Sequence, residues 1–200
     1  MISSAPWLYR LTQRVAAPGA DRNLSREIGR LLQELPPPGR CLDVGCGPDS
    51  ILRRLGLNPV GIDLCHARVL AFARANGLAA QAEATALPFA DGIFDSVWSF
   101  GLLHHLPDEA ARSAIKEMRR VTHPGGFIVV VDGVLPSSVL RRPFAALIRG
   151  LDRGGWMRTQ ESLETLLTSG GQWNCRRLTY ATTGLECVLA LGYGNIQADP

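Results

Sequence analysis

The chain has 200 residues, which favours a single domain (1–200) and is enough to bury about 70% of the unfolded chain's surface. Its 21 basic and 18 acidic residues leave a net charge of only +3, so no overall field favours a nucleic acid partner. The five cysteines show no C-x-x-C spacing, and we expect them to be reduced and structural. No apolar run reaches the length of a membrane span and no signal-peptide core develops, so we expect a cytoplasmic protein.

The first two thirds of the chain alternate between strand-like and helical segments. Apolar residues at helical spacing predict a helix from Leu24 to Leu35, which the prolines at positions 36–38 end. Alternation of this kind predicts right-handed crossovers, a parallel sheet covered on both faces, and a ligand site beyond the carboxyl ends of the strands. The predicted strands are residues 40–44, 58–63, 78–83, 94–99 and 127–132, and the predicted helices between them are residues 50–55, 66–76 and 108–121.

The pattern changes after Asp132. Residues 136–158 place arginines around an apolar stretch, and a short helix is predicted at residues 160–168. Two closing strands, at residues 173–180 and 185–191, are predicted to form a hairpin-like pair.

The most informative stretch is LDVGCG at residues 42–47. Glycines allow the backbone to turn tightly and approach a ligand, and Asp63, at the end of the next strand, can accept two ribose hydroxyls. A dinucleotide-binding loop would need glycine at Ser50 and has no use for the acid Asp43. A nicotinamide-dependent oxidoreductase is therefore the disfavoured alternative.

The stretch resembles motif I of the class I S-adenosylmethionine-dependent methyltransferases, D/E-x-G-x-G-x-G, with Asp49 in place of the third glycine. The resemblance runs from about residue 40 to 192 and is to the methyltransferase-11 group, which includes ubiquinone and menaquinone methyltransferases. It implies a doubly wound, Rossmann-like α/β fold: a mainly parallel seven-stranded sheet with an antiparallel last strand. The further motifs that carry it are VGIDL (60–64), AEA (82–84), LPFADG (87–92) with FD (94–95), LLHHL (102–106) and HPGG (123–126).

The same resemblance implies S-adenosylmethionine as cofactor and assigns its contacts. Asp63 would hold the ribose hydroxyls, Glu83 would face the adenine amino group, and the amide of Ala84 would face a ring nitrogen. Asp49 either caps the following helix or contacts the cofactor's amino group, and we favour the cap. The expected cofactor-binding residues are Asp43, Gly45, Gly47, Asp63, Leu64, Glu83, Ala84 and Ser99.

Two candidates for catalysis follow the fourth and fifth strands. An imidazole can accept a proton from a hydroxyl during methylation, and of the neighbouring His104 and His105 the second matches the family position. Asp132 would orient the acceptor or cap its own turn. Methyl transfer from a sulfonium requires mainly positioning and exclusion of water, so these residues could also be structural. No His, Cys and acid cluster has metal-ligand spacing, so no metal is expected.

The acceptor is expected to be a small molecule. Residues 99–102 lack the Asn/Asp-Pro-Pro-Tyr element of amino-methylating enzymes, which disfavours nucleobase and glutamine nitrogens. Residues 1–22 and 136–158 combine apolar residues with arginines and are expected to cover a lipophilic or aromatic acceptor with an anionic group. Two alternatives remain. The two segments could instead form a solvated basic face, or the whole chain could keep the fold without being catalytically active.

Overall fold

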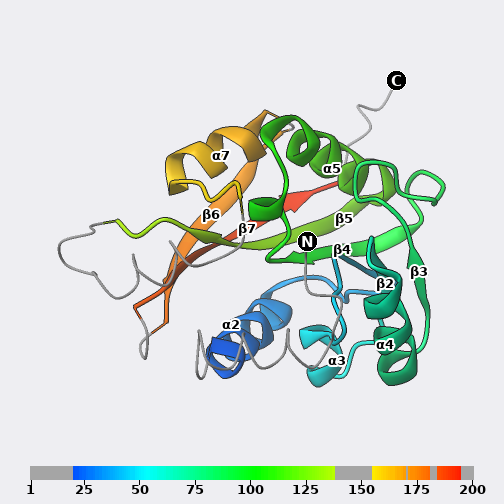
Figure 1. Ribbon diagram of the computed structural model, residues 1–200. Helices are drawn as coiled ribbons and strands as arrows, with labels where there is room; N and C mark the ends of the chain where they lie inside the picture. The colour runs from blue at the N-terminus through cyan, green and yellow to red at the C-terminus, as the bar shows by residue number, and fades with distance from the viewer. Residues whose placement is uncertain (1–19, 138–154, 170, 181–183, 195–200) are drawn as a thin grey trace.

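The computed structural model describes residues 20–137, 155–169, 171–180 and 184–194. Within these, one seven-stranded sheet has the order β3-β2-β1-β4-β5-β7-β6 (Figure 1). Only β7 runs against the others, because it pairs antiparallel with both β5 and β6. The strands are β1 (Cys41–Val44), β2 (Val60–Asp63), β3 (Ala79–Gln81), β4 (Phe94–Phe100), β5 (Thr122–Val134), β6 (Trp173–Thr179) and β7 (Glu186–Tyr193).

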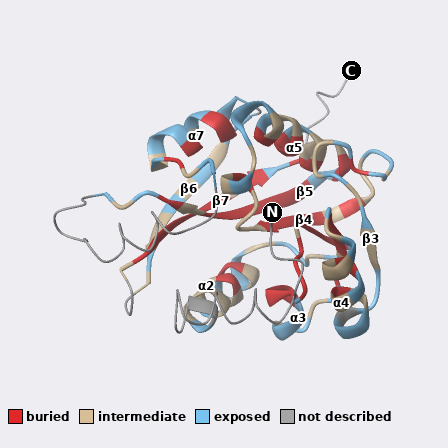
Figure 2. Cartoon of the chain, viewed as in Figure 1, coloured by how far each residue is buried: buried red, intermediate tan, exposed pale blue. Residues whose placement is uncertain are grey.

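Helices cover both faces of the sheet, with α2, α3 and α4 on one side and α5 and α7 on the other (Figure 1). Because strand side chains alternate, each central strand supplies both layers: Val97 packs toward α5 and α7, and Trp98 packs toward α2 and α3. Buried residues follow β1, β4, β5 and β7 through the middle of the molecule (Figure 2). The helices are α2 (Ala20–Glu34), α3 (Ile51–Arg54), α4 (His66–Asn76), α5 (Asp108–Val121) and α7 (Gln160–Thr168), with a 3₁₀ turn η1 (Leu103–His105).

The predicted fold is confirmed, including the antiparallel last strand. The amphipathic pattern of α5 buries its predicted apolar face, and α2 ends just before the three prolines. Strand β5 is longer than predicted, because Thr122 already pairs with Phe94 and a register shift separates that pair from Ser96. The turn η1 was not predicted.

Two expectations about covering segments concern residues that the structure describes only in part. Of the predicted N-terminal cover (1–22), residues 1–19 lie outside the described ranges, and of the insertion (136–158), so do residues 138–154. In the part of the chain that is described, no helix is long and apolar enough to cross a membrane.

Candidate functional site

The turn after β1 is built on two left-handed glycines, Gly45 (φ +74°) and Gly47 (φ +61°). A Cβ at Gly45 would lie 3.0 Å from Cδ1 of Leu102, so a side chain there would be both strained and crowded. The amides of Gly45 and Cys46 donate to the carbonyl of Ile62 at 2.8 and 2.9 Å. The turn is thereby held against the end of β2.

Asp63, at the carboxyl end of β2, is 6% exposed. Its two oxygens accept hydrogen bonds from the amides of Gly47 (3.1 Å) and Cys65 (2.8 Å), and Nη1 of Arg68 lies 3.7 Å from Oδ2. Two amides occupy two of the roughly four lone-pair positions of a carboxylate, which leaves capacity for further donors. Asp63 thus joins the two loops that its predicted ligand would contact.

Asp43 lies on β1 with 2% of its surface exposed. Its Oδ2 accepts a hydrogen bond from Oγ of Ser50 at 2.8 Å, while Oδ1 is buried without a partner among the described residues. Burial raises the pKa of Asp43 to about 7, the Ser50 hydrogen bond opposes that rise, and the negative charge of Asp63 adds to it. An unpartnered buried carboxylate oxygen beside the glycine turn fits a cationic ligand.

The predicted cap of α3 is wrong. Ser50, not Asp49, is the N-cap, and its hydroxyl accepts from the amide of Leu52 at 3.2 Å. Asp49 is exposed, and its Oδ1 accepts from the amide of Ser50 at 2.9 Å. The Ser50 hydroxyl therefore both caps α3 and donates to Asp43, two contacts that a glycine at this position could not make.

The remaining predicted cofactor residues lie in different environments. Leu64 follows β2 and is 63% exposed. Glu83 is also exposed, and its Oε2 accepts from Oγ1 of Thr85 at 3.3 Å, next to the half-buried Ala84. Ser99 is buried, and its hydroxyl donates to the carbonyl of Val44 at 3.1 Å, so that it joins β4 to β1. Leu64, Glu83 and Ala84 are the members of this group that present surface to a ligand.

Asp132 lies on β5 and is 2% exposed. Its carboxylate accepts hydrogen bonds from the amides of Leu103 and His104, the second at 3.2 Å, and pairs with Nδ1 of the His104 ring. The structure thus brings Asp132 to His104, whereas the ring of His105 is exposed and lies 4.1 Å from that of His104, centroid to centroid. Asp132 does not cap its own turn but holds the turn that follows β4.

Arg158 is a second residue that fixes this turn. Its guanidinium donates to the carbonyls of Leu103 and Leu106, both at 2.7 Å, and to Oδ1 of Asp108. The amide of Trp156, whose side chain is 51% exposed, donates to the carbonyl of His104 at 3.1 Å. In the sequence Arg158 is one of several arginines around an apolar stretch, and nothing there distinguishes it from a surface charge.

A similar arginine lies at the other end of α5, near the amino ends of β4 and β5. Arg120, in the last turn of α5, donates to the carbonyls of Phe89 (2.8 Å) and Leu87 (3.0 Å) and pairs with Glu117 and Asp91. Hydrogen bonding with Glu117 is the main cause that raises the pKa of Arg120. This arginine holds the loop that follows Glu83 and Ala84.

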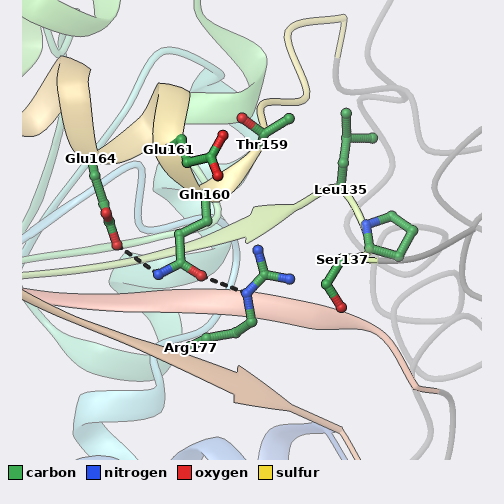
Figure 3. Close-up of a pocket in the computed structure, with 8 residues that line it drawn as sticks. Leu135, Ser137, Thr159, Gln160, Glu161, Glu164 and Arg177 are labelled. Carbon is green, nitrogen blue, oxygen red and sulfur yellow. Dashed lines mark hydrogen bonds between the residues drawn. The ribbon is translucent and has the colours of Figure 1, made fainter.

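A pocket of about 470 Å³ lies between the end of β5, the start of α7 and β6 (Figure 3). Figure 3 shows Gln160 between Glu164 and Arg177, with hydrogen bonds of 2.6 and 2.5 Å. Arg177 also pairs with the buried Glu186 at 2.8 Å. The pocket wall is therefore polar, and its arginine is already neutralised. It is lined by Leu135, Pro136, Ser137, Thr159, Gln160, Glu161, Glu164 and Arg177.

Within the described ranges, no group of three or more His, Cys, Asp or Glu side chains could hold a metal ion. The five cysteines are free, and three of them are buried. Burial raises the pKa of Cys46, the thiol inside the glycine turn, well above its ordinary range. This thiol is therefore an apolar filler of the turn.

Known proteins resemble this chain over most of its length. Residues 42–130 match the family model described as "Methyltransferase domain". An uncharacterized methyltransferase of Synechocystis sp. is 31% identical over 196 residues, which are 92% of this chain and 91% of that protein. A crystal structure titled as a SAM-dependent methyltransferase, possible histamine N-methyltransferase, of Thermotoga maritima is 17% identical, with a TM-score of 0.69 over 94% of this chain and 95% of that one.

Two further relatives are similar over about half of this chain. The 2-methyl-6-phytyl-1,4-hydroquinone methyltransferase of Synechocystis sp. is 41% identical over 50% of this chain and 34% of its own length. The tRNA (carboxymethyluridine(34)-5-O)-methyltransferase of Arabidopsis thaliana is 34% identical over 52% of this chain and 26% of its own length. The chain belongs to the methyltransferase family and is an S-adenosylmethionine-dependent methyltransferase.

Proposed function

We propose that the enzyme methylates a hydroxyl-bearing small molecule and that His104 is its general base. The observation that carries this proposal is the pairing of His104 Nδ1 with the buried carboxylate of Asp132. A carboxylate that accepts the Nδ1–H fixes the neutral ring in the tautomer whose Nε2 carries the lone pair. That nitrogen can accept a proton.

The chemical step needs one proton acceptor. S-adenosylmethionine, when bound, supplies an activated methyl group on a sulfonium. The O–H bond of the acceptor would break with its proton moving to Nε2 of His104, and the electron pair left on oxygen would bond to the methyl carbon while the carbon–sulfur bond breaks and leaves its electron pair on a neutral thioether. The imidazolium that results is stabilised by Asp132, whose two backbone amide contacts keep it in place.

The surroundings of His104 favour an aromatic acceptor. Trp156, held at the His104 carbonyl by its amide, and Leu135, 38% exposed after β5, offer apolar surface on this side. A hydroquinone combines such a ring with a hydroxyl, and a relative of this chain is named for one. The arginines of residues 136–158 are the basis for expecting an anionic group on the acceptor. The two arginines that are described near the acceptor side, Arg158 and Arg177, are already paired with carboxylates.

For the cofactor we propose that Oδ1 of Asp43 accepts from its ammonium group and that Asp63 accepts from the ribose. Glu83 and the amide of Ala84 would bind the adenine, with Leu64 against the ring. The orphaned oxygen of Asp43 and the remaining acceptor capacity of Asp63 support this arrangement.

Cofactor affinity is expected to rise with pH. Burial raises the pKa of Asp43 to about 7. Below that pH the Asp43 carboxyl of the folded, ligand-free protein keeps a proton that the unfolded chain has already lost. The contribution of Asp43 to the free energy of unfolding therefore falls as pH rises toward 7. A cationic ligand binds the ionised form, so calorimetry should show about 25-fold tighter binding at about pH 7.5 than at about pH 5.5. Asp43→Asn keeps an acceptor for Ser50 and should make affinity weak and flat with pH; an equal slope in both proteins would exclude Asp43.

Turnover with a panel of acceptors tests the acceptor class. With methyl-labelled cofactor, we expect label to enter hydroquinones and other small phenols and not their fully O-methylated counterparts, which have no proton to lose. Simple amines and total tRNA complete the panel. Labelled tRNA with unlabelled phenols would refute a small hydroxyl-bearing acceptor.

A further inference from the structure

We propose that Arg158 is a positioning residue that fixes the His104 turn in its productive geometry. The inference rests on the proposed role of His104. It concerns a residue that touches neither the cofactor nor the reacting atoms and acts through the turn alone.

The turn η1 is too short to hold itself. A 3₁₀ turn of three residues has few internal hydrogen bonds, here from the amide of His105 to the Leu102 carbonyl (3.0 Å) and from the amide of Leu106 to the Leu103 carbonyl (3.1 Å). Arg158 adds two shorter ones, because Nη1 donates to the Leu103 carbonyl and Nη2 donates to the Leu106 carbonyl, both at 2.7 Å. One planar guanidinium therefore spans the turn on both sides of His104.

The guanidinium is itself fixed. Arg158 is 8% exposed, and Nε and Nη2 hold Oδ1 of Asp108, at the start of α5, at 2.9 and 2.7 Å. Its backbone forms a parallel bridge with Val134, and its carbonyl accepts from the amide of Leu135 at 2.8 Å. The arginine thus connects the turn to α5 and to β5, the strand that carries Asp132.

This geometry sets the two partners of the proposed catalytic pair relative to each other. Asp132 comes from β5 and His104 from the turn after β4, and Arg158 is bonded to both of these segments. A displacement of about 1 Å at a reacting group can lower a rate by about a hundredfold. A guanidinium that holds the turn therefore affects the chemical step without taking part in it.

Arg120 provides a matched control. It also binds two backbone carbonyls and a carboxylate, but in the loop of Leu87 and Phe89, near the amino ends of β4 and β5. Loss of Arg120 is expected to lower the melting temperature and to leave His104 unchanged, and loss of Arg158 is expected to affect His104. A second control is Arg112→Ala, which removes an exposed arginine from the middle of α5.

The first measurement needs no acceptor. Long-range ¹H–¹⁵N spectra distinguish the two tautomers of a neutral histidine, and we expect the Nδ1–H form of His104 in the wild type, in Arg112→Ala and in Arg120→Ala. In Arg158→Ala and Arg158→Lys that form should lose its dominance, because a lysine ammonium cannot span both carbonyls. Calorimetric affinity for S-adenosylmethionine should stay within about twofold in both Arg158 variants, since the Arg158 side chain donates to Leu103, Leu106 and Asp108 and not to a proposed cofactor residue.

The second measurement is turnover with the best acceptor of the panel. Arg158→Ala should lower kcat by about 10- to 100-fold with little change in the Michaelis constant for the cofactor, and millimolar guanidinium chloride should restore part of the lost rate where sodium chloride does not. If Arg158→Ala does not fold, Arg158→Lys carries both measurements.

An unchanged His104 tautomer together with an unchanged kcat in Arg158→Lys would overturn the inference. Failure of the proposed function gives a different result: His104→Gln would then turn over normally, whatever the tautomer signal does in the Arg158 variants.

Discussion

His104→Gln is expected to lower kcat by about 10²- to 10⁴-fold, the usual contribution of a positioned general base. Glutamine keeps the size and polarity of the side chain and can still donate to Asp132, but it cannot accept the proton of the acceptor hydroxyl. Affinity for S-adenosylmethionine, measured by calorimetry, should change by less than about twofold.

His105→Gln is the matched control for this experiment. It makes the same chemical change one residue further on, at an exposed ring that does not touch Asp132 in the described hydrogen bonds. We expect kcat to remain within about threefold of the wild type. The reverse outcome, loss of turnover in the His105 variant alone, would return the catalytic role to His105 and remove it from His104.

Asp63→Ala is expected to weaken the binding of S-adenosylmethionine by about 2 to 4 kcal/mol, or about 30- to 1,000-fold. The reason is twofold, because the variant loses the proposed acceptor of the ribose hydroxyls and also frees the amides of Gly47 and Cys65. Calorimetry and the cofactor-induced rise in melting temperature both measure the effect.

Asp95→Ala is the control, because it also removes one negative charge and one hydrogen bond from a backbone amide. Asp95 accepts from the amide of Arg40 at 2.7 Å, but at the amino end of the strands, opposite the glycine turn. Its variant is expected to melt at a lower temperature and to bind the cofactor normally. Equal affinities in the Asp63 variant and the wild type would place the ribose elsewhere.

Most of the fold could be predicted from local sequence, for clear physical reasons. Helices α4, α5 and α7 begin and end where periodicity and the flanking residues predict, and Gly77, with φ +103°, ends α4. The inner strands are largely buried and apolar, so their positions are also visible in the sequence, although the predicted strand ends differ from the observed ones by a few residues. Strand β5 begins earlier because pairing with β4, not composition, decides where a strand starts.

The site was less accessible to sequence reasoning where contacts join distant residues. The choice between His104 and His105 depends on which ring faces Asp132, 28 positions away from His104 along the chain. The cap of α3 depends on a hydroxyl that also reaches Asp43, which Ser50 can do and the exposed Asp49 does not do. Arg158 could not be identified from the sequence for the same reason, because its hydrogen-bond partners lie on three other elements.

The order of the strands indicates which parts of the enzyme could be exchanged to alter its acceptor selectivity. Strands β3, β2, β1 and β4 carry or precede the proposed cofactor contacts, whereas β7 and β6 lie beyond β5. The pocket of Figure 3 is lined by α7, by Arg177 of β6 and by the residues that follow β5. Within the sheet the two halves are joined by the β4–β5 pairing, and His104 and Asp132 follow or lie on these two strands. Grafting α7 and β6 from a relative is therefore expected to exchange acceptor selectivity while the donor half, and its affinity, stay as they are.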